Sequence, residues 1–241
     1  MIPDWLTETA VAHRGYHNND SVFENSLPAF AAAVRAGFAI ELDVQLTGDG
    51  ELVVFHDFNL NRLTGLDRLV RKTSMDQIRA LHLGDTQDRI PTLEEALDLV
   101  SGRVPLLIET KNGNTEYLLE DQLCGTLREY GGLFAIQSFN PLSLARIRKN
   151  RPDIPRGQLA SRFTGAEGEG IAAWKRVCLR HFWLNVFSRP DFISYAIHDL
   201  PSRRVASFRA KGLPILGWTV RSGEDRETAA RYCDNIIFEE C

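Results

Sequence analysis

The apolar positions of this chain follow two alternating patterns. Short apolar runs, typical of buried strands, are separated by longer stretches in which apolar residues recur at helical spacing. The runs that predict the eight main strands are residues 9–13, 38–44, 105–110, 133–139, 154–160, 182–187, 213–220 and 235–239. A further apolar run, residues 52–56, is predicted to pair as a hairpin arm after the second strand.

Helix signals lie between these runs. The clearest helix begins after Ser26, has apolar residues at i, i+3, i+4 and i+7 from Leu27, and ends at Gly37. Thr92 and Glu95 form a capping box at the start of a second helix. The other predicted helices cover residues 115–130, a stretch that begins at residues 140–141, and residues 171–179, 201–211 and 224–232.

Alternating strands and helices predict right-handed βαβ units and a parallel sheet. Eight such units in 241 residues predict an α/β fold, a (β/α)8 TIM barrel, as a single domain over residues 1–241. An open doubly wound sheet is the rival architecture. It is less favoured because no glycine-rich dinucleotide-binding turn follows the first strand.

Residues 57–90 break this alternation. They are charged, contain few large apolar residues and show no sustained period, apart from one short helix predicted near residues 75–81. We expect a small insertion over the active-site face of the barrel rather than a separate domain. It contains too few large apolar residues to form a hydrophobic core of its own.

Composition narrows the class of protein. The chain is 44% hydrophobic and 25% charged, with a net charge of −4, as in ordinary soluble domains. Without a basic arm or a basic face with interleaved aromatics, no nucleic-acid partner is expected. No apolar stretch reaches transmembrane length, so no stable membrane insertion is expected. Four cysteines, widely spaced in the sequence, predict reduced thiols and a cytoplasmic location.

Three carboxylates stand at predicted strand ends. Glu41 and Asp43 are two positions apart, so both point to one face of their strand, and Glu109 ends the next barrel strand. The carboxyl ends of barrel strands carry the active site. Neighbouring carboxylates repel one another unless a cation lies between them, and oxygen ligands alone favour Mg²⁺ or Ca²⁺. The alternative, solvated edge residues, is disfavoured by the apolar run before Glu41.

His13 and His56 also end apolar runs. A histidine pair can divide general-base and general-acid work near neutral pH, although each histidine alone is equally well explained as a structural residue. Arg14 shifts the balance, because a guanidinium binds phosphate bidentately. Lys111 either contacts phosphate or pairs with the carboxylates, and neither role excludes the other.

Three further residues have weaker signals. Glu24 is expected to orient Arg14, or Asn25 to tie its loop to the start of the following helix. Trp218 ends a strand and either walls the pocket or belongs to the core.

Taken in order, the motifs of this chain resemble the glycerophosphodiester phosphodiesterase family. The matching motifs are His13-Arg14-Gly15, Glu24-Asn25-Ser26, Glu41-Leu42-Asp43-Val44-Gln45, Phe55-His56-Asp57, Pro91-Thr92-Leu93-Glu94-Glu95, Ile108-Glu109-Thr110-Lys111, Ser138-Phe139-Asn140-Pro141 and Gly217-Trp218-Thr219-Val220. They cover nearly the whole chain, which makes the combination specific although no single motif is.

The resemblance implies a barrel with a small insertion and the hydrolysis of a glycerophosphodiester to an alcohol and sn-glycerol 3-phosphate. It also implies a divalent metal ion, Mg²⁺ or Ca²⁺. The site residues that it implies are the catalytic His13 and His56, the metal ligands Glu41, Asp43 and Glu109, and the phosphate or substrate contacts Arg14, Lys111 and Trp218. In the mechanism proposed for such enzymes, a glycerol hydroxyl attacks phosphorus and water then opens the cyclic intermediate.

Two other functions stay open. A lysophospholipase D-like enzyme would use the same residues on a lipid with one acyl chain, but it needs a membrane-facing surface that the sequence does not predict. A non-catalytic barrel that binds phosphorylated polyols is less favoured, because a binder does not need two histidines beside a metal. The expected partner is a small-molecule substrate, and the sequence predicts no oligomeric state.

Overall fold

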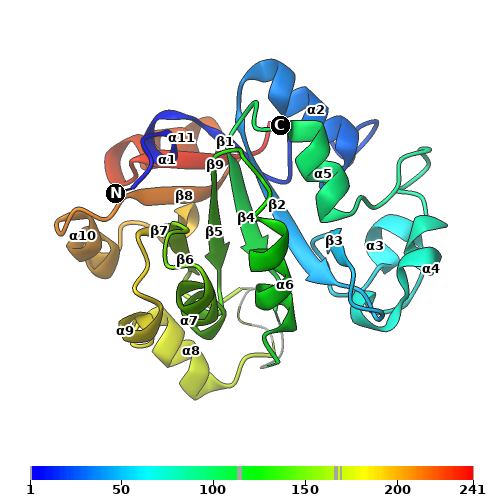
Figure 1. Ribbon diagram of the computed structural model, residues 1–241. Helices are drawn as coiled ribbons and strands as arrows, with labels where there is room; N and C mark the ends of the chain where they lie inside the picture. Colours follow the sequence, from blue (N-terminus) through cyan, green and yellow to red (C-terminus); the bar gives the residue numbers. More distant parts are fainter. Residues whose placement is uncertain (1, 113–115, 166–167, 169, 241) are drawn as a thin grey trace. The chain divides into compact units, whose positions relative to one another are not determined.

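The computed structural model describes residues 2–112, 116–165, 168 and 170–240, and Figure 1 labels its elements. The strands are β1 (Val11–Ala12), β2 (Ala39–Leu46), β3 (Leu52–Val54), β4 (Leu106–Thr110), β5 (Phe134–Ser138), β6 (Arg156–Ala160), β7 (Phe192–Ala196), β8 (Ile215–Val220) and β9 (Asn235–Phe238). The helices are α1 (Trp5–Glu8), α2 (Leu27–Ala36), α3 (Asn61–Thr64), α4 (Met75–Arg79), α5 (Leu93–Val100), α6 (Leu118–Thr126), α7 (Pro141–Asn150), α8 (Ala173–Arg180), α9 (Asn185–Ser188), α10 (Arg203–Arg209) and α11 (Gly223–Tyr232), with 3-10 turns η1 (Val70–Lys72) and η3 (Ile197–Asp199).

The strand order confirms the predicted fold class. Hydrogen bonds join the strands in the order β1-β9-β8-β7-β6-β5-β4-β2-β3, and β1 also pairs with β2. The pairs β2–β4, β5–β6, β6–β7, β7–β8 and β8–β9 are parallel, while β3 runs antiparallel to β2 as the predicted hairpin arm. Parallel strands connected through helices define a (β/α)8 barrel.

The chain divides into two compact units. The N-terminal unit contains residues 12–134 and residue 240, and the C-terminal unit contains residues 2–11 and 135–239. No helix within the described residues combines the length and the apolar character needed to cross a membrane.

Local signals in the N-terminal unit work as the sequence predicts. The Ser26 hydroxyl accepts a hydrogen bond from the Ala29 amide at 3.3 Å, and Gly37 ends α2 in the left-handed region at φ 76°. The reciprocal capping box of Thr92 and Glu95 starts α5. The predicted helix over residues 115–130 corresponds to α6, and its first residue lies outside the described part of the chain. These caps fix where the helices that flank β2 and β4 begin.

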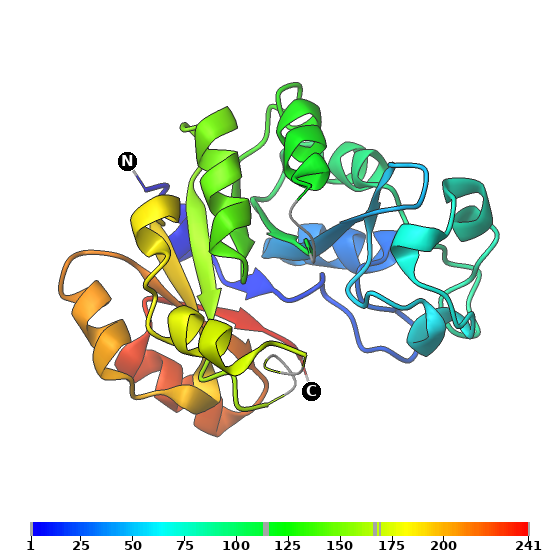
Figure 2. The ribbon, with the colours of Figure 1, turned by 90° about the horizontal axis from the view of Figure 1, so that it is seen from below.

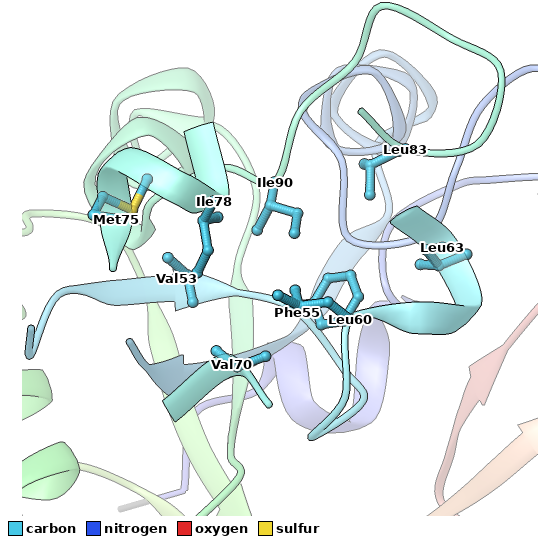
Figure 3. Packing of buried hydrophobic residues seen from close by; sticks show 9 residues of the cluster. All are labelled: Val53, Phe55, Leu60, Leu63, Val70, Met75, Ile78, Leu83 and Ile90. Carbon is cyan, nitrogen blue, oxygen red and sulfur yellow. The ribbon is translucent and has the colours of Figure 1, made fainter. Parts of the chain in front are cut away.

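Residues 57–90 contain more core than the sequence analysis expected. Seven of their side chains pack with Val53 and Phe55 into one buried cluster (Figure 3). The seven are Leu60, Leu63, Val70, Met75, Ile78, Leu83 and Ile90. The segment shows no sequence period because each short helix or turn contributes only one or two of these residues. Through this cluster the insertion packs against β3 and Phe55, directly before His56.

One strand prediction in the C-terminal unit is wrong. Residues 182–187, predicted as a strand, contain a turn and the start of helix α9, and the strand is β7, Phe192–Ala196. Strand β7 is fully buried and pairs with β6 and β8. A short apolar run does not by itself distinguish a strand from a helix, and Trp183, Val186 and Phe187 are exposed rather than buried.

Candidate functional site

The structure brings the three predicted carboxylates together in the N-terminal unit. Glu41 and Asp43 lie on β2, and the parallel register sets Asp43 opposite Glu109 on β4. One oxygen from each residue lies within 4.8 Å of the others, and all three residues are buried. Three carboxylate oxygens this close form the donor set that a hard divalent cation prefers.

The charges of this cluster are only partly compensated. Burial raises the pKa of Glu41, and the neighbouring charges of Asp43 and Glu109 raise it further. Burial also raises the pKa of Glu109, against the opposing effect of Lys111. The pKa of Asp43 is lowered, because Lys111, His56, Arg14 and His13 together outweigh its burial. Negative charge therefore accumulates where a cation would relieve it.

An unpartnered atom supports the same interpretation. The buried Glu41 Oε1 has no hydrogen-bond partner among the described residues. A buried carboxylate oxygen without a partner is costly, and a metal ion would satisfy it. The residues present thus fit a divalent metal ion.

Lys111 lies against two of the three carboxylates. Its ammonium nitrogen is 2.6 Å from Glu109 Oε1 and 3.1 Å from Asp43 Oδ1. Burial alone would lower the pKa of Lys111, but the charges of Asp43 and Glu109 raise it above its usual value. The pairing of Lys111 with the carboxylates, one of the two predicted possibilities, is therefore present.

His13 and Arg14 reach the cluster from the end of β1. His13 Nε2 lies 3.9 Å from Glu41 Oε2, and the Arg14 backbone N–H donates to the same oxygen at 2.9 Å. Arg14 has a left-handed φ of 54°, and Gly15 follows with φ 82°. A Cβ at Gly15 would lie 2.9 Å from the Ala29 Cβ, so only glycine fits this close approach.

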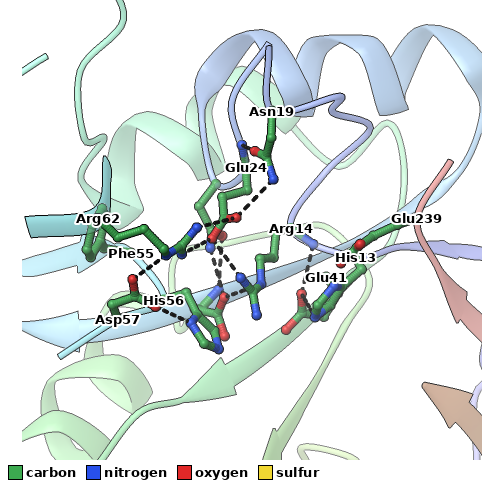
Figure 4. A network of polar contacts seen from close by, with 12 residues as sticks. His13, Arg14, Asn19, Glu24, Glu41, Phe55, His56, Asp57, Arg62 and Glu239 are labelled. Atoms are coloured by element: carbon green, nitrogen blue, oxygen red, sulfur yellow. Dashed lines mark hydrogen bonds and ion pairs between the residues drawn. The ribbon is translucent and has the colours of Figure 1, made fainter. Parts of the chain in front are cut away.

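His56 is held by a chain of ion pairs that sequence reasoning did not find (Figure 4). Its Nδ1 lies 2.7 Å from Asp57 Oδ1, and Arg62 Nε donates to Asp57 Oδ2 at 2.5 Å. Arg62 also donates twice to Glu24, at 2.7 and 3.0 Å, and Glu24 accepts from Arg14 at 2.6 Å. Arg62, on α3 of the insertion, therefore connects His56 to Arg14.

The two carboxylates that pair with Arg62, Glu24 and Asp57, are ionised over a wide pH range. Burial works against the ionised form of Glu24, but hydrogen bonds and charges from Arg62 and Arg14 lower its pKa to about 2. Burial likewise opposes ionisation of Asp57, and His56 and Arg62 outweigh it and lower the Asp57 pKa. An ionised carboxylate only accepts hydrogen bonds, so His56 Nδ1 is the donor to Asp57.

The two loop predictions had different outcomes. Glu24 orients Arg14, as one of the predicted alternatives stated. The Asn25 side chain does not bind the helix start; its amide donates to Asp43 Oδ2 at 2.8 Å and its oxygen accepts from the Asp43 amide. Asn25 adopts a left-handed φ of 55°, which turns its side chain toward β2. The loop after β1 thereby supports one of the three clustered carboxylates.

An open pocket of about 580 Å³ lies beside His56 and Lys111. Its other lining residues come from the start of the insertion and are Asp57, Phe58, Asn59, Asn61 and Arg62. No sequence signal marks Arg62, because it is one of many charged residues in a segment without a period.

Trp218 lies on β8 in the C-terminal unit. Its ring packs edge-to-face on Phe139 at 5.6 Å between centroids, within a group that also includes Phe163. The Trp218 indole N–H is buried and has no hydrogen-bond partner among the described residues. A buried indole N–H usually has a hydrogen-bond partner. Because this one has none among the described residues, it is available to donate to a ligand atom.

Comparison with known proteins places this chain in a family of phosphodiesterases. Residues 13–238 match the model of the glycerophosphoryl diester phosphodiesterase family, and the chain belongs to that family. It is 33% identical to a glycerophosphodiester phosphodiesterase of Caldanaerobacter subterraneus, over 95% of this chain and 93% of that protein. It is 29% identical to a glycerophosphodiester phosphodiesterase of Bacillus subtilis, over 93% of this chain and 80% of that protein.

Solved structures of other proteins support the same fold. An Oleispira antarctica phosphodiesterase in complex with the product sn-glycerol-3-phosphate superposes with a TM-score of 0.79 at 24% identity, covering 95% of this chain and 92% of the other. A putative glycerophosphoryl diester phosphodiesterase from Silicibacter pomeroyi gives a TM-score of 0.80 at 26% identity, over 95% and 89% of the two chains.

Proposed function

We propose that this protein is a metal-dependent glycerophosphodiester phosphodiesterase. It hydrolyses a glycerophosphodiester to an alcohol and sn-glycerol 3-phosphate. The observation that carries the proposal is the buried cluster of Glu41, Asp43 and Glu109, with His13, Arg14 and Lys111 in contact with it. The family membership of residues 13–238 supports the same reaction.

Glu41, Asp43 and Glu109 would hold the metal ion, for which we propose Mg²⁺ or Ca²⁺. When bound, the ion supplies positive charge that stabilises the phosphoryl oxygens as the reaction proceeds. Arg14 adds a guanidinium, which is suited to a second phosphate oxygen. Lys111, between the carboxylates and the pocket, contributes a further positive charge at the phosphate.

His13 and His56 would move the protons. Because Asp57 binds His56 Nδ1, the Nε2 atom of His56 is left for proton transfer. In the first step a glycerol hydroxyl attacks phosphorus and gives its proton to one histidine, while the other protonates the leaving alcohol. Water then opens the cyclic phosphate with the two roles reversed. Either histidine can be the first base in this scheme.

Trp218 would contact the substrate through its buried, unpartnered indole N–H. A phosphodiester or a glycerol hydroxyl offers the acceptor that this donor lacks. The insertion, residues 57–90, supplies five of the residues that line the pocket beside His56, and Arg62 is one of the five. We assign it the role of a cover over the active-site face.

The test is hydrolysis of glycerophosphocholine with Mg²⁺ or Ca²⁺, with sn-glycerol 3-phosphate measured enzymatically as the product. Lysophosphatidylcholine is assayed in parallel. We expect turnover of the water-soluble diester, and preferred turnover of the lipid would support the lysophospholipase D-like function instead.

The lysophospholipase D-like function is favoured by one observation, the exposed Trp174 and Trp183 of the C-terminal unit. Binding of both compounds without turnover of either would contradict both enzymatic functions.

A cytoplasmic location is part of the same proposal. Its support is cysteine usage, since Cys178 and Cys233 are free thiols and Cys233 is buried.

A further inference from the structure

Helices α8 and α9 and the turn between them expose an unusual number of apolar side chains. Within residues 174–187, five large apolar residues are exposed, and α8 has no buried residue. They are Trp174 at 67%, Val177 at 44%, Trp183 at 58%, Val186 at 65% and Phe187 at 56%. We call residues 174–187 the aromatic segment; both of its helices carry labels in Figure 1 and appear in yellow in Figure 2.

The exposure of the aromatic segment is local. Single exposed apolar residues are normal on a protein surface, and Leu133 and Tyr232 are such cases elsewhere in the chain. A concentration of five in one short segment marks an interaction surface. Trp174 and Val177 are three positions apart, so they share one face of α8.

The charge of the same stretch is uniform. Residues 171–190 contain no aspartate or glutamate, although the whole chain has a net charge of −4. Four basic residues lie there, Lys175, Arg176, Arg180 and Arg189, and all four are exposed. Within the described residues none of them forms an ion pair. Two more arginines come from outside the stretch, since Arg148 donates to the Phe187 carbonyl and Arg204 to the His181 carbonyl, each at 3.2 Å.

Exposed aromatic side chains beside uniformly basic ones fit the surface of an anionic lipid bilayer better than the surface of another protein. Tryptophan is favoured at the boundary between lipid headgroups and hydrocarbon, where its ring is buried and its N–H stays hydrated. Lysine and arginine beside such rings bind anionic headgroups. The short helices are suited to lying in the interface plane, and no described helix is able to cross the membrane.

We propose that the aromatic segment docks this protein reversibly on the surface of an anionic lipid bilayer. The rings of Trp174 and Trp183 enter the headgroup boundary, and Lys175, Arg176 and Arg180 bind the negatively charged headgroups. The proposal does not rest on the proposed hydrolysis, because lipid docking is measured without substrate.

The experiment is co-sedimentation of the full chain with vesicles of phosphatidylcholine alone and of phosphatidylcholine with an equal part of phosphatidylglycerol. We expect binding to the anionic vesicles only, and weaker binding as salt is added. Each basic residue near an anionic surface strengthens binding about fivefold, so Lys175→Gln/Arg176→Gln/Arg180→Gln should weaken it on the order of 100-fold. Trp174→Ser/Trp183→Ser should weaken it roughly tenfold or more.

The matched control is Leu133→Ser/Tyr232→Ser, which removes two exposed apolar side chains outside the segment and should leave vesicle binding unchanged. Circular dichroism and turnover of glycerophosphocholine in solution check that each variant is folded. Wild-type protein that stays in the supernatant with anionic vesicles would overturn the proposal. So would tryptophan variants that bind as tightly as the wild type. A concentration-dependent dimer that is lost in those variants, without vesicle binding, would assign the segment to self-association.

Discussion

The carboxylate cluster of the N-terminal unit and the aromatic segment of the C-terminal unit invert the usual pattern of burial in opposite ways. Glu41, Asp43 and Glu109 are charged groups buried where a core residue is expected. Trp174 and Trp183 are large apolar groups exposed where a polar residue is expected. Each arrangement costs free energy in the isolated protein. In each case the proposed partner would remove the cost, a cation in one region and a lipid surface in the other.

The two regions differ in how firmly they are built. The carboxylates are held by the strand register, by Asn25 and by Lys111, so the site is preorganised for its ligand. The aromatic segment consists of two short helices and the turn between them. Within the described residues, its basic side chains form no ion pairs. We therefore expect substitutions in the first region to change chemistry strongly and substitutions in the second to change only location.

The largest effect is expected for the histidines. His13→Ala and His56→Ala should each lower kcat by about 10²–10⁴-fold, the usual contribution of a general acid or base. Metal binding should remain, because neither histidine belongs to the three-carboxylate donor set. Steady-state kinetics with glycerophosphocholine measure the change, and His181→Ala is the matched control. Undiminished turnover of either variant would remove that histidine from the mechanism.

A smaller effect is expected for Arg62, which positions His56 through Asp57. Arg62→Ala should lower kcat by about 10–100-fold, the range typical of partners that orient a functional group. Arg62→Lys should restore part of the loss, since a lysine keeps the charge but not the fork-shaped contact with Glu24.

The control for Arg62 is Arg68→Ala in the same insertion, because among the described residues the Arg68 side chain donates only to Gln77, at 3.2 Å. If Arg62→Ala raised KM alone, with kcat unchanged, the residue would bind substrate rather than position His56.

The Arg62 contact also marks the limit of sequence reasoning. The carboxylate cluster could be predicted, because the period of two places Glu41 and Asp43 on one face of β2 and the barrel order brings Glu109 beside them. Arg62 could not, because its contacts with Asp57 and Glu24 depend on how a segment without a period folds back.

The aromatic segment was misjudged for a related reason. Residues 182–187 are as apolar as a buried strand, and a single sequence does not reveal that three of them are exposed. The strand that was not predicted, Phe192–Ala196, contains Ser194 and is no more apolar than residues 182–187. Helix caps were predicted well because capping depends on residues only three positions apart, as at Ser26 and Thr92.

A further prediction concerns the stability of the fold rather than the activity. The folded pKa of Glu24 is about 2, below its ordinary 4.5, so Glu24 stabilises the fold above pH 4.5 and this contribution is lost as the pH falls toward 2. The contribution is on the order of 3 kcal/mol. Glu24→Gln should therefore be less stable than the wild type at pH 7, and most of the difference should disappear by pH 3.

Urea unfolding at both pH values measures this difference, with the exposed Glu129→Gln as the control. An equal difference at pH 7 and pH 3 would contradict the assignment of the stabilisation to ionised Glu24.

We propose that Glu41, Asp43 and Glu109 bind one divalent cation that the reaction requires. The most direct measurement is calorimetric titration of Mg²⁺ and Ca²⁺ into EDTA-treated protein, compared with Asp43→Asn, alongside turnover before and after the metal is restored. We expect one site per chain in the wild type, loss of that site in the variant, and activity that falls with EDTA and returns with the metal. Full activity in EDTA, or unchanged metal affinity in Asp43→Asn, would contradict the proposed metal site.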